Sequence, residues 1–167
     1  MQIVIPADGL IILCGPAACG KSTFARRHFR PTQIVSSDRC RAMLTDSAAT
    51  QWASGEAFEL FHMIIDKRLG LNRLTVADST ALSKPARRDL RRIARARRKP
   101  AVLIVFNVSK QDCLKHDAGR GRRVGEDVID AHIEKLNTAL KDIRNEKYDS
   151  VYVLDEKEME EAKVKKK

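Results

Sequence analysis

Short apolar runs alternate along the chain with longer segments in which apolar residues recur three or four positions apart. The short runs predict strands at 2–5, 10–14, 33–36, 74–77, 101–106 and 150–154. The run at 10–14 is apolar throughout, which is typical of a strand buried on both faces of a parallel sheet. The strand at 2–5 is expected to lie at an edge, since Pro6 ends it.

The segments between these runs have the apolar spacing of helices. They predict helices at 21–29, 37–44, 57–69, 83–99 and 126–145. Pro31 and Pro100 are expected to stop the helices that precede them. The remaining segments predict a mobile loop at 45–55, a short helix with a glycine- and arginine-rich stretch at 109–125, and a charged tail at 156–167.

Strands that alternate with helices predict an α/β fold with a parallel sheet of about five strands and helices on both faces. The 167 residues suit one domain, and no linker divides them. No apolar run approaches the roughly 20 residues that cross a bilayer, and the start lacks a signal-peptide pattern. The four cysteines have no metal-ligand spacing, so we expect reduced thiols in a cytoplasmic protein without membrane contact.

Residues 15–23, G-P-A-A-C-G-K-S-T, match the Walker A pattern and lie between a predicted strand and a predicted helix. We expect the loop to cradle the phosphates of ATP or another nucleoside triphosphate with its backbone N–H groups. Lys21 should reach the β- and γ-phosphates, Ser22 should bind Mg²⁺, and Thr23 can contact the α-phosphate. The predicted nucleotide-binding residues are Gly15, Pro16, Ala17, Ala18, Cys19, Gly20, Lys21, Ser22 and Thr23.

Two acidic residues follow other predicted strands at the same edge of the sheet, where open α/β folds place their ligands. Asp38 and Arg41 are three residues apart and share a helix face. Asp38 can accept a proton from an attacking hydroxyl while Arg41 holds a phosphate, or Asp38 can simply cap a helix. Asp78 can hold a magnesium-bound water or serve as a turn residue, and the sequence leaves these alternatives open.

Several motifs together resemble the kinase domain of the bacterial polynucleotide kinase-phosphatase family of RNA repair. The matching residues are I-P at 5–6, G-x-x-x-x-G-K-S-T-F-A at 15–25, H-F-x-P-T-x-x-x-S-S-D-x-C-R at 28–41, K-R-L at 67–69, L-T-V-x-D-x-T at 74–80, V-F-N at 105–107 and V-Y-V-L at 151–154. The resemblance implies a P-loop kinase fold with an arginine-bearing lid at about 109–125. It also implies transfer of the ATP γ-phosphate to the 5′-OH end of single-stranded RNA or DNA.

Site residues carry over from this resemblance position by position. It implies that Lys21, Asp38, Arg41 and Arg123 are catalytic, with Asp38 as general base and Arg41 as the clamp on the acceptor phosphate. Arg120 and Arg123 are implied to close on the triphosphate. Related proteins continue into phosphatase and ligase modules, which are possible partners in the same or another chain.

The sequence departs from the family pattern at His116, where the family has an arginine, and at Ala81, where it has an asparagine. His116 can make the lid chemistry weaker or pH-sensitive, or it can be an exposed surface residue, which is the favoured interpretation. Two other functions stay open: a small-molecule kinase of the gluconate or shikimate type, and a nucleotide-binding module without catalysis.

The formal charge of +10 suits a polyanionic partner or a solvated basic surface. Arg87 and Arg88 begin an arginine-rich helix near the predicted active edge, and we predict that they contact the acceptor strand. Trp52 can stack on a base, but a partly buried anchor is the favoured interpretation. His62 and His132 are interpreted as core histidines, and 165–167 as a disordered tail.

Overall fold

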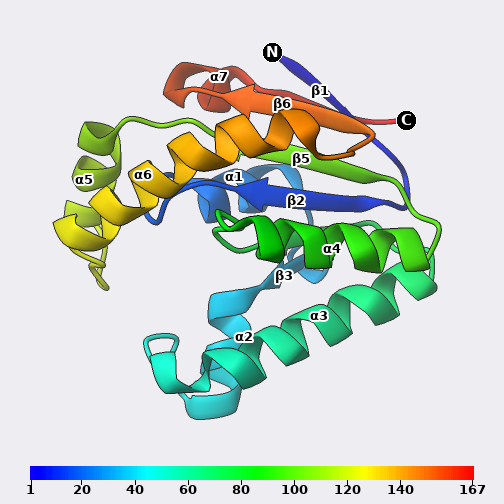
Figure 1. Cartoon of the computed structure of the whole chain (residues 1–167), viewed down its shortest axis with the longest axis horizontal. Coiled ribbons are helices and arrows are strands. Elements are labelled where there is room, and N and C mark those ends of the chain that lie inside the picture. The colour runs from blue at the N-terminus through cyan, green and yellow to red at the C-terminus, as the bar shows by residue number, and fades with distance from the viewer.

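A five-stranded parallel sheet forms the centre of the computed structural model, which describes residues 1–167 (Figure 1). Its strands, in spatial order, are β3 (Ile34–Ser36), β4 (Thr75–Asp78), β2 (Leu10–Cys14), β5 (Ala101–Phe106) and β6 (Ser150–Leu154). All neighbouring strands in this sheet are parallel. The predicted α/β fold with five parallel strands is therefore confirmed.

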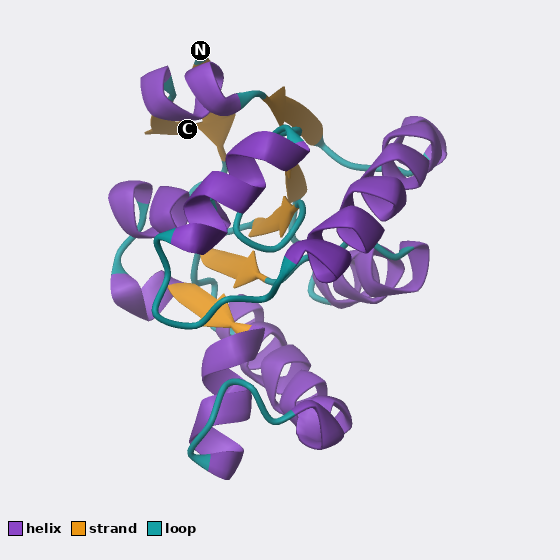
Figure 2. Ribbon diagram, turned by 90° about the vertical axis from the view of Figure 1, so that its left-hand side faces the viewer, coloured by secondary structure: helices purple, strands orange, loops and turns teal.

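Helices cover both faces of the sheet, as Figure 2 shows. The helices are α1 (Lys21–His28), α2 (Ser37–Thr45), α3 (Ser54–Gly70), α4 (Lys84–Ala96), α5 (Lys110–Ala118), α6 (Glu126–Asp142) and α7 (Glu156–Glu161), with short 3₁₀ turns η1 (Pro31–Gln33), η2 (Gln51–Ala53) and η3 (Ile143–Asn145). No helix is long and apolar enough to cross a membrane.

The central strand β2 contributes to two separate hydrophobic cores because its side chains alternate between faces. Leu10 and Ile12 pack with apolar residues of α3, α4 and α6. Ile11 and Leu13 pack on the opposite face with residues of α1, β1 and α6. All five residues of β2 are fully buried, which explains their continuous apolar pattern.

The C-terminal segment is not the disordered tail that was predicted. After α7, residues Lys163–Lys166 form strand β7, which pairs in parallel with β1 (Gln2–Ile5) as a second, two-stranded sheet. Asp155 caps α7, because its carboxylate accepts a hydrogen bond from the Glu158 N–H. The Glu158 carboxylate in turn accepts one from the Asp155 N–H. Packing of Ala162 and Val164 in the core, together with backbone pairing, orders this lysine-rich strand.

The predicted element boundaries differ from the structure at the end of α4 and after α2. The arginine-rich helix α4 ends at Ala96, three residues before the predicted end, and Arg98 adopts a left-handed backbone with φ 54°. The polar segment after α2 contains η2, which leads directly into α3. Helices α2 and α3 extend beyond the sheet on the β3 side (Figure 1).

Candidate active site

The Walker A loop lies between β2 and α1, at the carboxyl edge of the sheet. Gly15 packs so closely that an added Cβ would lie 2.9 Å from the Phe106 Cβ and 3.0 Å from the Cys19 Sγ. The Gly15 N–H donates to the Thr80 carbonyl, 2.9 Å away, and this bond ties the loop to the end of β4. Gly20 has φ 95°, a left-handed conformation that favours glycine, and α1 begins at the next residue.

Lys21 and Ser22 begin α1 and point into the site. The Lys21 ammonium donates to the Gly15 carbonyl at 2.9 Å and to the Pro16 carbonyl, so it is folded over the loop. The Ser22 hydroxyl donates to Asp78 Oδ2, 2.7 Å away. Burial raises the pKa of Asp78, and the bond from Ser22 and the charge of Lys21 partly offset this effect.

Asp38 lies in the first turn of α2, but it does not cap the helix. Ser36 is the N-cap and accepts from the Arg39 N–H at 3.2 Å, which leaves the Asp38 carboxylate free for other contacts. Asp38 Oδ1 accepts from Arg41 Nη1 at 2.8 Å. The Asp38 side chain is half exposed, whereas Arg41 is buried.

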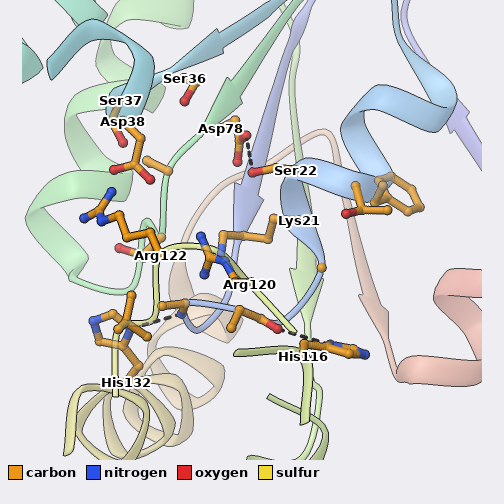
Figure 3. Close-up of a pocket in the computed structure, with 18 of the residues that line it drawn as sticks. Lys21, Ser22, Ser36, Ser37, Asp38, Asp78, His116, Arg120, Arg122 and His132 are labelled. Carbon is orange, nitrogen blue, oxygen red and sulfur yellow. Dashed lines mark hydrogen bonds between the residues drawn. The ribbon is translucent and has the colours of Figure 1, made fainter. Parts of the chain in front are cut away.

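One cavity of about 1140 Å³ brings these residues together. In Figure 3, Asp38 and Asp78 lie on one side of Lys21, and His116 and His132 lie on the other. Of the predicted site residues, those that line the cavity are Ala17, Ala18, Gly20, Lys21, Ser22, Thr23, Asp38, Arg41 and Arg120. Gly15, Pro16 and Cys19 form the base of the loop behind this lining.

The predicted lid corresponds to α5 and the segment 119–125 that follows it. Asp117 holds this segment by accepting from the backbone N–H groups of Val124 and Gly125, and these bonds lower the pKa of its carboxyl. Arg120 and Arg122 line the cavity. Arg123 does not line it, and its guanidinium donates instead to the Ala118 carbonyl at 2.9 Å.

The prediction that Arg87 contacts an acceptor is wrong, because Arg87 is fully buried. Its guanidinium donates to Glu146 at 2.8 Å from Nη2, and to the carbonyls of Ala81 and Leu82 at 3.1 and 2.7 Å from Nη1. Arg88 is exposed but lies outside the cavity lining. Ala81 is buried and does not line the cavity.

Two histidines that are not among the predicted site residues contact the phosphate loop. His116 is only partly exposed, and its Nδ1 lies 3.1 Å from the Ala18 carbonyl while its Nε2 lies 3.2 Å from Glu156 Oε1. His132 Nδ1 accepts from the Ala17 N–H at 3.0 Å. His116 lies within the lid, near the end of α5, and His132 lies in α6. Both line the cavity, so the interpretations as surface and core residues are wrong.

His132 makes a pH-dependent contribution to stability. Burial and the charges of Lys21 and Lys135 lower its pKa below 6.5, so neutral His132 can accept the Ala17 bond. As pH falls below 6.5, the unfolded chain binds this proton before the folded one, and stability is lost. Wild type should therefore lose about 1 kcal/mol more than His132→Asn between pH 8 and 5, as measured by urea unfolding.

Asparagine is the matched replacement, because it keeps an acceptor near the Nδ1 position but does not titrate. His28 and His62 also have lowered pKa values. They contribute equally to the pH dependence of the free energy of unfolding in wild type and in the variant. If the free energy of unfolding had the same pH dependence in wild type and in the variant, His132 would not make this contribution.

The site offers hard oxygen ligands for a divalent cation. Ser22 Oγ and Asp78 Oδ2 are adjacent, and no group of three or more His, Cys, Asp or Glu residues is placed to hold a metal ion. Mg²⁺ is typically bound by one or two protein oxygens, substrate phosphates and water, so this pair fits Mg²⁺.

Solved structures with this fold include several kinases. The chain is similar to the Pnkp1/Rnl/Hen1 RNA repair complex, with a TM-score of 0.71, 20% identity and coverage of 83% of this chain and 47% of that one. It is also similar to a gluconokinase from Sinorhizobium meliloti 1021 (TM-score 0.58, 18% identity, 90% and 84% covered). A third is shikimate kinase from Bacteroides thetaiotaomicron (TM-score 0.56, 11% identity, 92% and 93% covered).

These similarities establish a P-loop kinase-like fold. The chain spans less than half of the first of these structures. No curated protein matches the chain significantly. The family model described as an AAA domain, AAA_33, matches residues 10–143, which include the Walker A loop, Asp38, Asp78 and the lid. The chain therefore belongs to this AAA domain family of P-loop fold.

Proposed function

We propose that this protein transfers the γ-phosphate of ATP, or of another nucleoside triphosphate, to the 5′-OH end of single-stranded RNA or DNA. One observation carries the proposal: Asp38, paired with Arg41, lines the same cavity as Lys21 and Ser22. A carboxylate in this position can accept the proton of the attacking hydroxyl. The end product would be a 5′-phosphorylated strand, as needed in nucleic-acid repair.

The part of the cavity next to the Walker A loop, here called the donor half, suits a bound triphosphate. The Walker A loop leads into the N-terminus of α1, and Lys21 supplies a positive charge. Ser22 and Asp78 would hold Mg²⁺, which when bound neutralises charge on the phosphate oxygens. Arg120 and Arg122 reach the cavity from the lid, and Arg123 would have to leave Ala118 to join them.

The part of the cavity around Asp38 and Arg41, here called the acceptor half, favours a substrate that carries phosphates. Arg41 lines the cavity next to Asp38, and its planar guanidinium suits a phosphodiester oxygen pair. The net charge of +10 favours a polyanion over a small sugar acid. Similarity to an RNA repair complex adds support, and phosphatase and ligase modules are the partners we expect.

A transfer assay with terminally labelled ATP tests the proposal. Paired RNA and DNA strands of one sequence would be offered with a 5′-hydroxyl, and the same strands with a 5′-phosphate serve as controls. Label should appear only on the hydroxyl strands, and the rate should fall steeply with salt. Label on gluconate or shikimate alone would favour a small-molecule kinase, and ATP binding without any labelled product would favour a non-catalytic module.

A further inference from the structure

Trp52 is 82% exposed, more than any other large hydrophobic residue in the chain. The interpretation as a partly buried anchor is therefore wrong. Its neighbour Ala53 is buried, so the backbone of η2 packs against the protein while the indole ring projects into solvent. An exposed tryptophan presents a large flat apolar surface, and such rings are common where proteins bind ligands.

The segment that carries Trp52 is held on both sides by Arg41. Arg41 Nη1 donates to the Ala48 carbonyl at 3.2 Å, and Nη2 donates to the Ser54 hydroxyl at 3.3 Å. The same guanidinium pairs with Asp38. The position of the ring is thus coupled to the two residues proposed to meet the acceptor.

The cavity reaches the residue next to Trp52. Gln51 lines it together with Asp38, Arg41 and Phe58. Consecutive Cα atoms are about 3.8 Å apart, so Trp52 lies at the margin of the acceptor half. The Arg41 Nε is buried and has no hydrogen-bond partner in the protein.

We propose that Trp52 stacks on a base of the acceptor strand, next to the nucleotide whose 5′-hydroxyl faces Asp38. This inference rests on the proposed function and adds a contact to its acceptor site. An aromatic ring beside a phosphate-binding arginine is the arrangement with which proteins hold single strands. Because every base has a flat face, the contact would favour single-stranded ends without selecting a sequence.

Trp52 is the only tryptophan in the chain, so its fluorescence reports on this position alone. We expect a 5′-OH oligonucleotide, added without ATP, to quench the emission to a saturating limit. A strand of equal length with abasic sites at its first three positions should not quench. Quenching by both strands, or by neither, would overturn the stacking assignment.

The transfer assay gives a second measurement. Trp52→Ala should raise KM for the oligonucleotide by about 5- to 150-fold, leave KM for ATP unchanged, and have no effect on the abasic strand. Trp52→Phe should retain most of the affinity. Met43→Ala is the matched control, because Met43 is also exposed and apolar, but neither of its neighbours in the sequence lines the cavity.

The two proposals fail in different ways. Quenching without any transfer to the strand would refute the proposed function and leave the Trp52 contact standing. Transfer with unchanged KM in Trp52→Ala would refute only the contact. Emission that changes with protein concentration in the absence of nucleic acid would show that a second copy of the chain covers the ring, and this too would overturn the inference.

Discussion

Replacing Asp38 with asparagine is expected to slow phosphoryl transfer to a 5′-hydroxyl by about 10²- to 10⁴-fold. The variant keeps an oxygen that can accept from Arg41, but it loses the group that takes the hydroxyl proton. ATP binding should be unchanged, because the phosphate loop and Lys21 do not contact Asp38. Single-turnover kinetics together with a nucleotide-binding titration would separate the two effects.

Asp46→Asn provides a matched control for this experiment. Asp46 ends the same helix, is exposed and lies outside the cavity lining. It has φ 59°, a conformation that asparagine adopts readily, so the substitution should not disturb α2. Wild-type transfer rates in Asp38→Asn would remove Asp38 from the role of base.

Replacing Arg87 with alanine is expected to lower the free energy of unfolding by about 3–5 kcal/mol. Burial alone would raise the pKa of Glu146, but the bonds from Arg87 and Tyr148 outweigh this and lower it. Without Arg87, the Glu146 carboxylate and the carbonyls of Ala81 and Leu82 lose their buried donor. Domains of ordinary stability have only about 5–15 kcal/mol in total, so urea unfolding should show a large shift.

Arg88→Ala is the control, because the exposed Arg88 differs from Arg87 mainly in burial, and its removal should cost less than about 0.5 kcal/mol. The double variant Arg87→Met, Glu146→Leu should recover most of the stability, since it leaves no unpaired charge. Equal losses for Arg87→Ala and Arg88→Ala would contradict the structural role of the buried pair.

The parts of the molecule that sequence predicts best are those in which local pattern and burial coincide. The run at β2 is buried on both faces, and this burial produces the apolar pattern from which the strand was predicted. The Walker A pattern lies within one short loop, so it can be recognised without knowing any contact to a distant residue. Asp38 and Asp78 meet at one edge of the sheet because parallel strands place their carboxyl ends together.

The parts that sequence missed depend on contacts between distant residues. His132 bonds to Ala17, 115 positions earlier, and nothing in its helix indicates that partner. The pairing of β7 with β1 joins the two ends of the sequence, and only one apolar residue marks β7. Arg87 could have been recognised, because Arg87, Leu90 and Ala94 share one helix face and are all buried.

The pairing of β1 with β7 has a consequence for synthesis of the chain. Ile3 and Ile5 are buried in the finished fold, but their partner strand is roughly 160 residues away. Ribosomes add about 5–20 residues each second, so these isoleucines wait on the order of 10–30 s for it. During that interval β1 keeps an unpaired edge and its isoleucines lack their partner strand, so we expect this segment to be open to non-native pairing until β7 has been made.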